Sequence, residues 1–142
     1  MRRVFTIVLC ILLLTGCSHG VKIKADESTF LIGLRNNCDC EIYKLHHEYY
    51  IGDNPIGGGC ACYADGSAIR TGDVLVKDFI SADFPEGANL AEYRIEVFVV
   101  DGAGNEYSCG EALHLDAAYG NTYEIIITGN YESGFTASWS GS

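Results

Sequence analysis

Basic residues are scarce in this chain of 142 residues, where nine Lys and Arg stand against nineteen Asp and Glu and the net charge is −10. Nucleic acids and anionic membrane surfaces are bound through Lys and Arg, so this balance argues against both as charge-driven partners. Proline is also rare, with two residues against seventeen glycines, which favours strands joined by glycine turns. The length predicts one domain.

Sequence signatures of catalysis are also missing. The chain contains no Gly-x-Ser-x-Gly motif and no glycine-rich phosphate loop with a lysine. Its carboxylates are scattered, as a solvated surface requires, and no internal repeat is present. We therefore expect no catalytic residues and no cofactor.

No apolar run reaches the length of a membrane-spanning helix. The longest run, Val4–Leu14, is apolar apart from Thr6 and follows a positive start, Met1-Arg2-Arg3. A helix needs about 20 residues to cross the roughly 30 Å hydrocarbon core, so this run is too short to span and instead predicts a signal peptide. The next residues, Leu14-Thr15-Gly16-Cys17, resemble the lipobox of bacterial lipoproteins.

This resemblance implies cleavage between Gly16 and Cys17, and a diacylglyceryl thioether on Cys17 with further acylation by a fatty acid such as palmitate. Two or three acyl chains hold a protein stably on a membrane. In Gram-negative lipoproteins Ser18, in place of Asp, favours the outer membrane. The alternatives are an ordinary secretory signal and an uncleaved anchor. We expect residues 1–16 to be the signal peptide and residues 17–27 to be the lipidated cysteine and its tether. Without Arg2 and Arg3, the remaining chain has a net charge of −12.

The rest of the chain alternates between apolar and polar residues with a period of two, which predicts strands. We expect residues 28–142 to form an all-β, antiparallel, immunoglobulin-like β-sandwich of about seven strands. A small barrel is the alternative. The Asp101–Glu106 loop also gives a diffuse resemblance to uncharacterised small β-sandwich lipoproteins, which implies no activity. The predicted strands cover residues 30–35, 42–51, 74–76, 93–100, 113–115, 123–128 and 135–139, and the predicted turns include residues 52–55, 57–59, 101–105, 119–121 and 128–130.

Five cysteines follow Cys17, and four of them form two Cys-x-Cys pairs. Residues two apart on a strand share a face, so two antiparallel strands could join Cys38 to Cys62 and Cys40 to Cys60 in one register. Each disulfide would contribute about 2–4 kcal/mol in an oxidising compartment. A zinc site usually has a wider Cys-x₂₋₄-Cys spacing, so we predict no metal site. Free buried thiols remain the alternative, and Cys109 is predicted to be a core residue, the partner of one of the four, or the partner of a cysteine in another molecule.

Other candidate sites have simpler explanations. Adjacent strand residues face opposite ways, so His46 and His47 cannot easily share a metal ion, and Glu48 follows them. His114 is predicted to be exposed. A nucleophilic Cys60 lacks a group that would orient its base. Asp101, Asn105 and Glu106 offer oxygens for Ca²⁺, but a hairpin loop explains them better.

The aromatic residues leave a binding role open. Tyrosine and tryptophan suit contacts with sugar or protein, and five of them could line a binding face: Tyr49, Tyr50, Tyr63, Tyr131 and Trp139. We therefore expect a membrane-anchored extracytoplasmic lipoprotein with a binding or structural role and a protein or glycan partner. The alternative is a small-ligand or metal-binding accessory lipoprotein of an envelope enzyme or transport system. The ligand, the oligomeric state and the host envelope type are not predicted.

Overall fold

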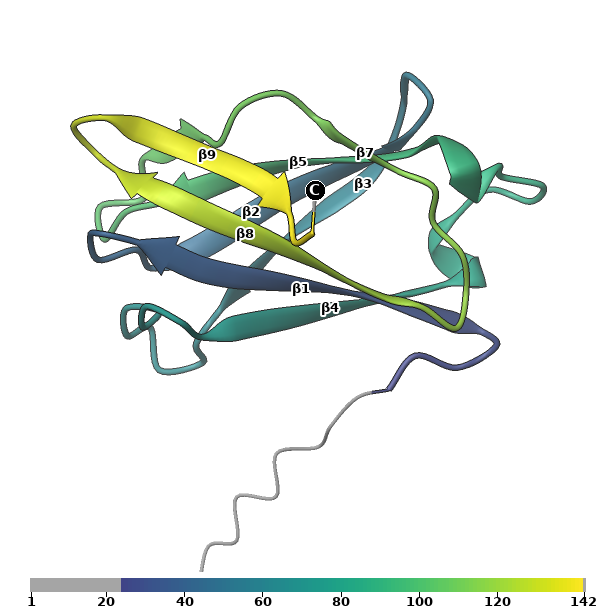
Figure 1. The fold of residues 1–142 in the computed structure, drawn as a ribbon, viewed down its shortest axis with the longest axis horizontal. Coiled ribbons are helices and arrows are strands. Elements are labelled where there is room, and N and C mark those ends of the chain that lie inside the picture. Colours follow the sequence, from purple (N-terminus) through teal and green to yellow (C-terminus); the bar gives the residue numbers. More distant parts are fainter. Residues whose placement is uncertain (1–23, 142) are drawn as a thin grey trace, which may run out of the picture.

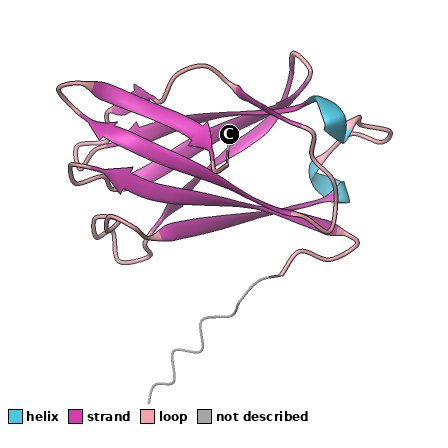
Figure 2. Cartoon of the chain, in the orientation of Figure 1, coloured by secondary structure: helices cyan, strands magenta, loops and turns pink. Residues whose placement is uncertain are grey.

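A computed structural model describes residues 24–141, in which two β-sheets pack face to face (Figure 1). Its helical content is two short 3₁₀ turns, η1 and η2, at one end of the sandwich (Figure 2). This confirms the predicted all-β sandwich. The elements of this part of the chain are β1 Thr29–Cys38, β2 Lys44–Ile51, β3 Asn54–Cys62, β4 Val74–Ile80, η1 Ser81–Asp83, η2 Leu90–Glu92, β5 Tyr93–Val100, β6 Glu106–Ser108, β7 Leu113–Leu115, β8 Thr122–Asn130 and β9 Gly134–Trp139.

The core lies between the two sheets and follows the alternation in the sequence. One sheet has the strand order β4-β1-β8-β9, and the other has the order β3-β2-β5-β6, with β7 pairing with the other end of β5. Burying each large side chain contributes roughly 1.5–3 kcal/mol. The inward residues of the two central strands β1 and β5 are almost fully buried: Phe30, Ile32 and Leu34 on β1, and Tyr93, Ile95, Val97 and Val99 on β5.

Two strands lie outside the predicted set, and β3 is the instructive one. Gly57–Gly59, predicted as a turn, lies in the middle of β3, an edge strand. Gly57 makes room for the ring of Tyr49 on β2, because a Cβ atom there would lie 2.7 Å from the phenol oxygen, and a Cβ atom at Gly58 would lie 2.7 Å from the backbone oxygen of His47. The glycines therefore serve packing here, which removes the alternation that would have revealed the strand. The other added strand is β6.

One strand pair departs from the antiparallel arrangement that we expected. β1 and β8 run parallel, in a register from Leu31 opposite Thr122 to Cys38 opposite Gly129. Alternation has the same period in both directions, so it carries no information on strand direction. As a result, β8 begins at the end of the sandwich where the chain enters β1 (Figure 1).

Candidate functional site

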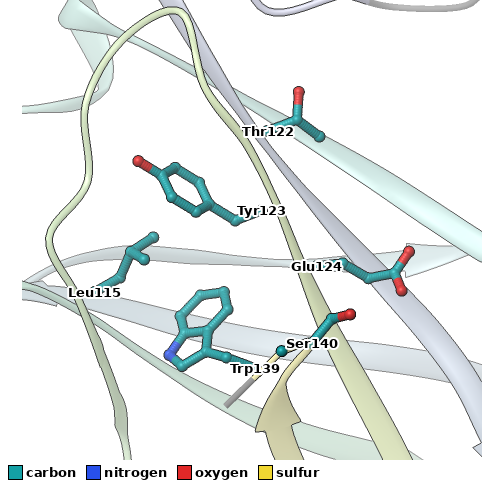
Figure 3. Close-up of a pocket in the computed structure, with 7 residues that line it drawn as sticks. Leu115, Thr122, Tyr123, Glu124, Trp139 and Ser140 are labelled. Atoms are coloured by element: carbon teal, nitrogen blue, oxygen red, sulfur yellow. The ribbon is translucent and has the colours of Figure 1, made fainter.

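The clearest candidate site is a notch at the side of the sandwich, where β9 ends before it has covered all of β8. Trp139, the last residue of β9, lies opposite Ile125. The chain then leaves the sheet after the Ser140 N–H donates to the carbonyl oxygen of Glu124 at 2.8 Å. This leaves a hollow of about 450 Å³ beside the start of β8 (Figure 3). The notch is lined by Leu115, Thr122, Tyr123, Glu124, Trp139, Ser140 and Gly141.

Two aromatic rings and a leucine form the apolar part of the notch. The Tyr123 and Trp139 ring centroids lie 6.3 Å apart with an angle of 66° between the planes. Leu115 of β7 lies beside them (Figure 3). An edge-to-face pair of this kind contributes about 0.5–1.5 kcal/mol beyond its buried area. Both rings belong to the same sheet, and Leu115 on β7 of the other sheet completes this apolar cluster.

The polar atoms of both rings bond within the protein. The Trp139 Nε1–H donates to the backbone oxygen of His114 at 2.8 Å. The Tyr123 hydroxyl donates to the Asp116 carbonyl at 3.3 Å and accepts from the Ala118 N–H at 3.2 Å. These bonds fix the orientation of the rings, so the notch is formed before any ligand arrives.

The outer face of the sheet at the notch carries polar groups in fixed positions, on the other side of β8 from the two rings (Figure 3). Arg35 holds the Glu124 carboxylate with two bonds, Nε to Oε1 at 3.0 Å and Nη2 to Oε2 at 2.9 Å. Hydrogen bonding to Arg35 holds the pKa of Glu124 below its usual range. Thr122 and Ser140 add exposed hydroxyl groups. The notch thus combines a carbon surface with hydrogen-bonding groups and no uncompensated local charge.

A larger hollow, of about 690 Å³, lies beside the loop that contains Tyr63 and Arg70. The Tyr63 hydroxyl donates to the Asp73 carboxylate, and Arg70 Nε also donates to this carboxylate at 3.1 Å. The lining otherwise consists of small and polar residues, Ala64, Asp65, Ser67 and Ala68. Tyr63 is the only aromatic residue in its lining, whereas the notch is lined by two rings in contact, so the notch is the better candidate.

The strand register that we predicted for two disulfides is wrong. Cys38 lies in β1, whereas Cys60 and Cys62 lie in β3 of the other sheet. The β3 strand pairs with β2, where Cys60 lies opposite His46 and Cys62 lies opposite Lys44. Neither cysteine therefore lies opposite Cys38 or Cys40. Both are exposed, and Cys38, Cys40, Cys60, Cys62 and Cys109 are all free thiols in the structure.

Two of the free thiols belong to the core. Cys38 and Cys109 are 1% and 2% exposed. Burial, with a smaller effect of Cys40 and then Cys109, raises the pKa of Cys38 to about 12. Burial likewise raises the pKa of Cys109 to about 11. The prediction that Cys109 is a core residue is confirmed, and both thiols are poor nucleophiles at neutral pH.

The two adjacent histidines face opposite sides of β2, as predicted. His46 stacks on Phe98 and its Nδ1 lies 3.0 Å from Glu106 Oε1 on the outer face. His47 is 2% exposed, and neither of its ring nitrogens has a hydrogen-bond partner in the part of the chain that the structure describes. Burial, followed by Lys77 and His46, lowers the pKa of His47 to about 4. His47 is therefore a neutral core residue.

The oxygens considered for Ca²⁺ do not converge. The Asp101 carboxylate accepts from the N–H groups of Ala103 and Asn105, both at 2.9 Å, and so closes its own hairpin. Glu106 instead faces His46. Within residues 24–141, no group of three or more His, Cys, Asp or Glu side chains is arranged to hold a metal ion.

The five aromatic residues that could have lined one binding face are dispersed. Tyr49 is buried in the core, and the Tyr50 hydroxyl contacts Glu48 and Glu96 on the outer face of the other sheet. Tyr131 packs on Tyr107 at 5.0 Å. Trp139 alone of the five lines the notch, and its partner Tyr123 was missed because only the end of β9 brings the two rings together.

The signal peptide, the lipobox and Cys17 lie outside the described residues. Within residues 24–141, no helix has the length and apolar character needed to cross a bilayer. His114 is exposed, as predicted, and its Nε2 lies 2.9 Å from the Ala91 carbonyl oxygen.

Comparison with known proteins gives distant structural likenesses only. No family model matches the sequence, and no curated protein matches it. An NMR structure of a protein from Eubacterium rectale is 12% identical with a TM-score of 0.45, covering 82% of this chain and 92% of the other. A proposed cell adhesion protein from Bacteroides fragilis is 13% identical with a TM-score of 0.41, covering 84% and 47%. A structure of a disulfide-locked mutant of intermedilysin with human CD59 is 9% identical with a TM-score of 0.39, covering 80% and 24%.

Proposed function

We propose that this chain is a lipid-anchored binding protein of the cell envelope and that the notch between β7, β8 and β9 is its ligand site. The observation that carries the binding role is the pairing of Tyr123 and Trp139 in a hollow at the part of β8 that β9 leaves uncovered. Small-molecule sites are typically concave, mostly apolar and furnished with a few well-placed polar groups, with volumes of about 300–1,000 Å³. The notch fits this description at about 450 Å³.

The state of the notch carboxylate supports binding over catalysis. Arg35 keeps Glu124 ionised and occupies both of its oxygens. A general acid needs a proton at neutral pH, and a general base needs a raised pKa near the working pH. Glu124 has neither property, whereas a fixed carboxylate is well suited to accept hydrogen bonds from a ligand.

The envelope location rests on Leu14-Thr15-Gly16-Cys17. Acyl chains on Cys17 would anchor the protein, since each buried CH₂ contributes about 0.8 kcal/mol. Residues 18–28 would then join the lipid to β1, and an extended chain of this length reaches at most about 40 Å. The sandwich would therefore stay close to the membrane, with the notch near the end where β1 begins.

The anchor is tested by fractionating cells that express the full chain. Cys17→Ala should move the protein out of the membrane fraction, because its thiolate is the group that accepts the lipid. Cys10→Ala is the matched control, since it also removes a leader cysteine but leaves the lipobox intact, and it should stay membrane-bound. Equal membrane partitioning of Cys17→Ala and the unmodified sequence would contradict the anchor.

The binding site is tested with two exposed threonines of the same sheet. Thr122→Arg places a large side chain in the notch, whereas Thr136→Arg changes an exposed residue of β9 outside it. The chain that begins at Ser18, which lacks the lipidated Cys17, should co-sediment with isolated host envelopes without detergent, and Thr122→Arg should weaken this binding about tenfold. Thr136→Arg should bind like the unmodified chain. Equal binding by all three proteins would remove the notch as the ligand site.

A further inference from the structure

We infer that two copies of this chain join at the free edge of β3, through a disulfide between Cys60 of one copy and Cys60 of the other. β3 is the end strand of its sheet, and within residues 24–141 its backbone hydrogen bonds are made with β2 alone. Its other edge therefore presents unpaired N–H and C=O groups, which are a template for a further strand.

The two halves of this edge differ in their protection. Proteins protect edge strands with charged side chains, proline or bulges. The first half of β3 contains Pro55, and its register against β2 shifts between Tyr49 and Tyr50. The second half, Gly57–Cys62, contains neither proline nor a charged residue and keeps a regular register. This half is therefore open to strand pairing.

The other edges of the described sheets are protected. β4 carries Lys77 and Asp78, and β6 and β7 are each three residues long. On β9, the Ala137 N–H donates to the Cys109 carbonyl at 2.9 Å. The second half of β3 is thus the edge on which a second copy can pair.

The direction of the backbone groups of β5 is shown by bonds to two neighbours. The Val97 carbonyl accepts from the Cys109 N–H on the β6 side, and the Val100 carbonyl accepts from the Tyr43 N–H on the β2 side. Backbone groups of successive strand residues point to opposite sides, so the even-numbered residues of β5 bond to β2.

The same alternation fixes the groups at the free edge of β3. Even-numbered residues of β5 lie opposite even-numbered residues of β2, so the odd-numbered residues of β2 bond to β3. These lie opposite odd-numbered residues in the second half of β3, as His47 lies opposite Gly59. The unpaired N–H and C=O groups at the free edge therefore belong to Gly58, Cys60 and Cys62.

This arrangement brings thiols together when two copies pair. Cys60 and Cys62 are both exposed. A twofold axis at Cys60 pairs Gly58–Cys62 of one copy with the same segment of the other, and the unpaired groups then face each other. Opposite residues in such positions have Cα atoms about 5.5 Å apart, a usual distance for a disulfide. Pairing Cys60 with Cys62 of the second copy would instead extend into residues 63–64, beyond the end of β3.

A disulfide within one strand fits less well. Residues two apart on a strand have Cα atoms about 6.7 Å apart, at the upper end of the range that disulfides span. The exposed thiols of one copy are therefore better placed for a link to a second copy than for a link between Cys60 and Cys62.

The link has to be covalent because the contact is small. A stable interface usually involves about 20–30 residues on each side, whereas this edge offers part of one strand. The chain beyond residue 16 also has a net charge of −12, which repels a second copy.

The link forms by thiol–disulfide exchange, with a small-molecule or protein disulfide as the oxidant. The Cys60 thiolate of one copy attacks the oxidant and releases one of its thiols. The Cys60 thiolate of the second copy then attacks the Cys60 sulfur of this mixed disulfide and releases the other thiol. The two chains lose two protons and two electrons, and the oxidant gains them as two thiols. The reduced chain keeps both thiols exposed.

The test uses the chain that begins at Ser18, with oxidised glutathione as the oxidant, so its outcome depends on neither the anchor nor the notch. Equal amounts of unlabelled and isotope-labelled chain are mixed in the reduced state, oxidised and digested. We expect a linked peptide of mixed mass, with fragmentation assigning the link to Cys60 of each chain. Recovery of a Cys60–Cys62 link within single chains instead would overturn the inference.

Three variants separate pairing at the edge from random collision of exposed thiols. Cys60→Ser should lower the yield of covalent dimer about tenfold, whereas Cys62→Ser should leave it within about twofold. Cys62→Pro keeps the Cys60 thiol and removes an N–H that points away from β2, so it should lower the yield about tenfold with unchanged far-ultraviolet circular dichroism. Equal yields from Cys62→Pro and Cys62→Ser would overturn the edge pairing, and a full yield from Cys60→Ser would overturn the link.

Discussion

His47 lies directly opposite Gly59 in the antiparallel pair of β2 and β3, and its imidazole ring packs over the backbone of Gly59. A Cβ atom at Gly59 would lie 3.4 Å from His47 Cε1 and 3.5 Å from Nε2. The ring is thereby buried without a hydrogen-bond partner among the described residues, next to the positive charge of Lys77. This arrangement makes the fold sensitive to acid.

Stability should fall as the pH drops below about 6.5, because the unfolded chain binds a proton at His47 before the folded protein does. The folded pKa of about 4 lies below the ordinary histidine pKa of 6.5, so the loss of stability grows as the pH falls between these values and is complete below pH 4. Between pH 7 and pH 5 it amounts to about 2 kcal/mol. Urea unfolding at several pH values measures it.

Two variants isolate His47 from the carboxylates that also titrate. His47→Met keeps an apolar side chain of similar size and should remove most of the loss between pH 7 and pH 5. His114→Gln, which changes an exposed histidine, should retain the pH dependence of the unmodified chain. If His47→Met and the unmodified chain lose the same free energy of unfolding over this range, the assignment of His47 as a neutral buried residue is wrong.

Asn36 should be among the most sensitive polar positions. It is 0% exposed, donates from Nδ2 to the Ile69 carbonyl at 2.8 Å and accepts from the Cys38 N–H at 3.0 Å. Asn36→Ala leaves both backbone groups without a partner and should cost about 2–4 kcal/mol in the free energy of unfolding. Asn37→Ala, at the exposed next position, should cost less than about 0.5 kcal/mol. Denaturant titration of both variants compares them, and similar losses would contradict the burial of Asn36.

Thiol labelling of the native protein should show two classes of cysteine. Cys60 and Cys62 are exposed and should react quickly with iodoacetamide, whereas Cys38 and Cys109 are buried with pKa values raised to about 12 and about 11. Peptide mapping by mass spectrometry gives the rate at each position. Fast labelling of Cys38, or recovery of a Cys38–Cys62 link, would contradict the structure.

Two glycines in the hairpin between β8 and β9 share a positive φ but should differ in how well they tolerate substitution by alanine. Gly129 and Gly134 both have positive φ, +111° and +86°. A Cβ atom at Gly129 would lie 2.1 Å from the Gly134 carbonyl oxygen, whereas one at Gly134 meets nothing within 4 Å. Gly134→Ala should cost about 1–2 kcal/mol from strain alone, and Gly129→Ala should cost clearly more. Thermal unfolding ranks them, and an equal or reversed order would contradict this hairpin geometry.

The alternation of apolar and polar residues was sufficient to locate a strand and its inner face where one face of the strand is buried. The run of Tyr93, Ile95, Val97 and Val99 predicted β5 and its inner face, and the same rule placed His46 and His47 on opposite sides of β2. It could not find β3, because Gly57–Gly59 have no side chains to alternate, and the close approach of β2 to Gly57 and Gly58 is visible only in the fold.

The alternation of apolar and polar residues does not show which strands lie next to each other in a sheet. The disulfide register assumed that the two Cys-x-Cys segments pair, but sheet order places β2 next to β3 and β8 next to β1. The notch was hidden for the same reason. It exists because β9 stops opposite Ile125, and Tyr123 meets Trp139 only through that register.

The location outside the cytoplasm underlies the proposed function, and intact-mass spectrometry of the chain purified from host membranes tests it most directly. We predict a polypeptide that begins at Cys17 and carries the added mass of a diacylglyceryl group, with or without a further acyl chain. An unmodified polypeptide that begins at Met1 would contradict it.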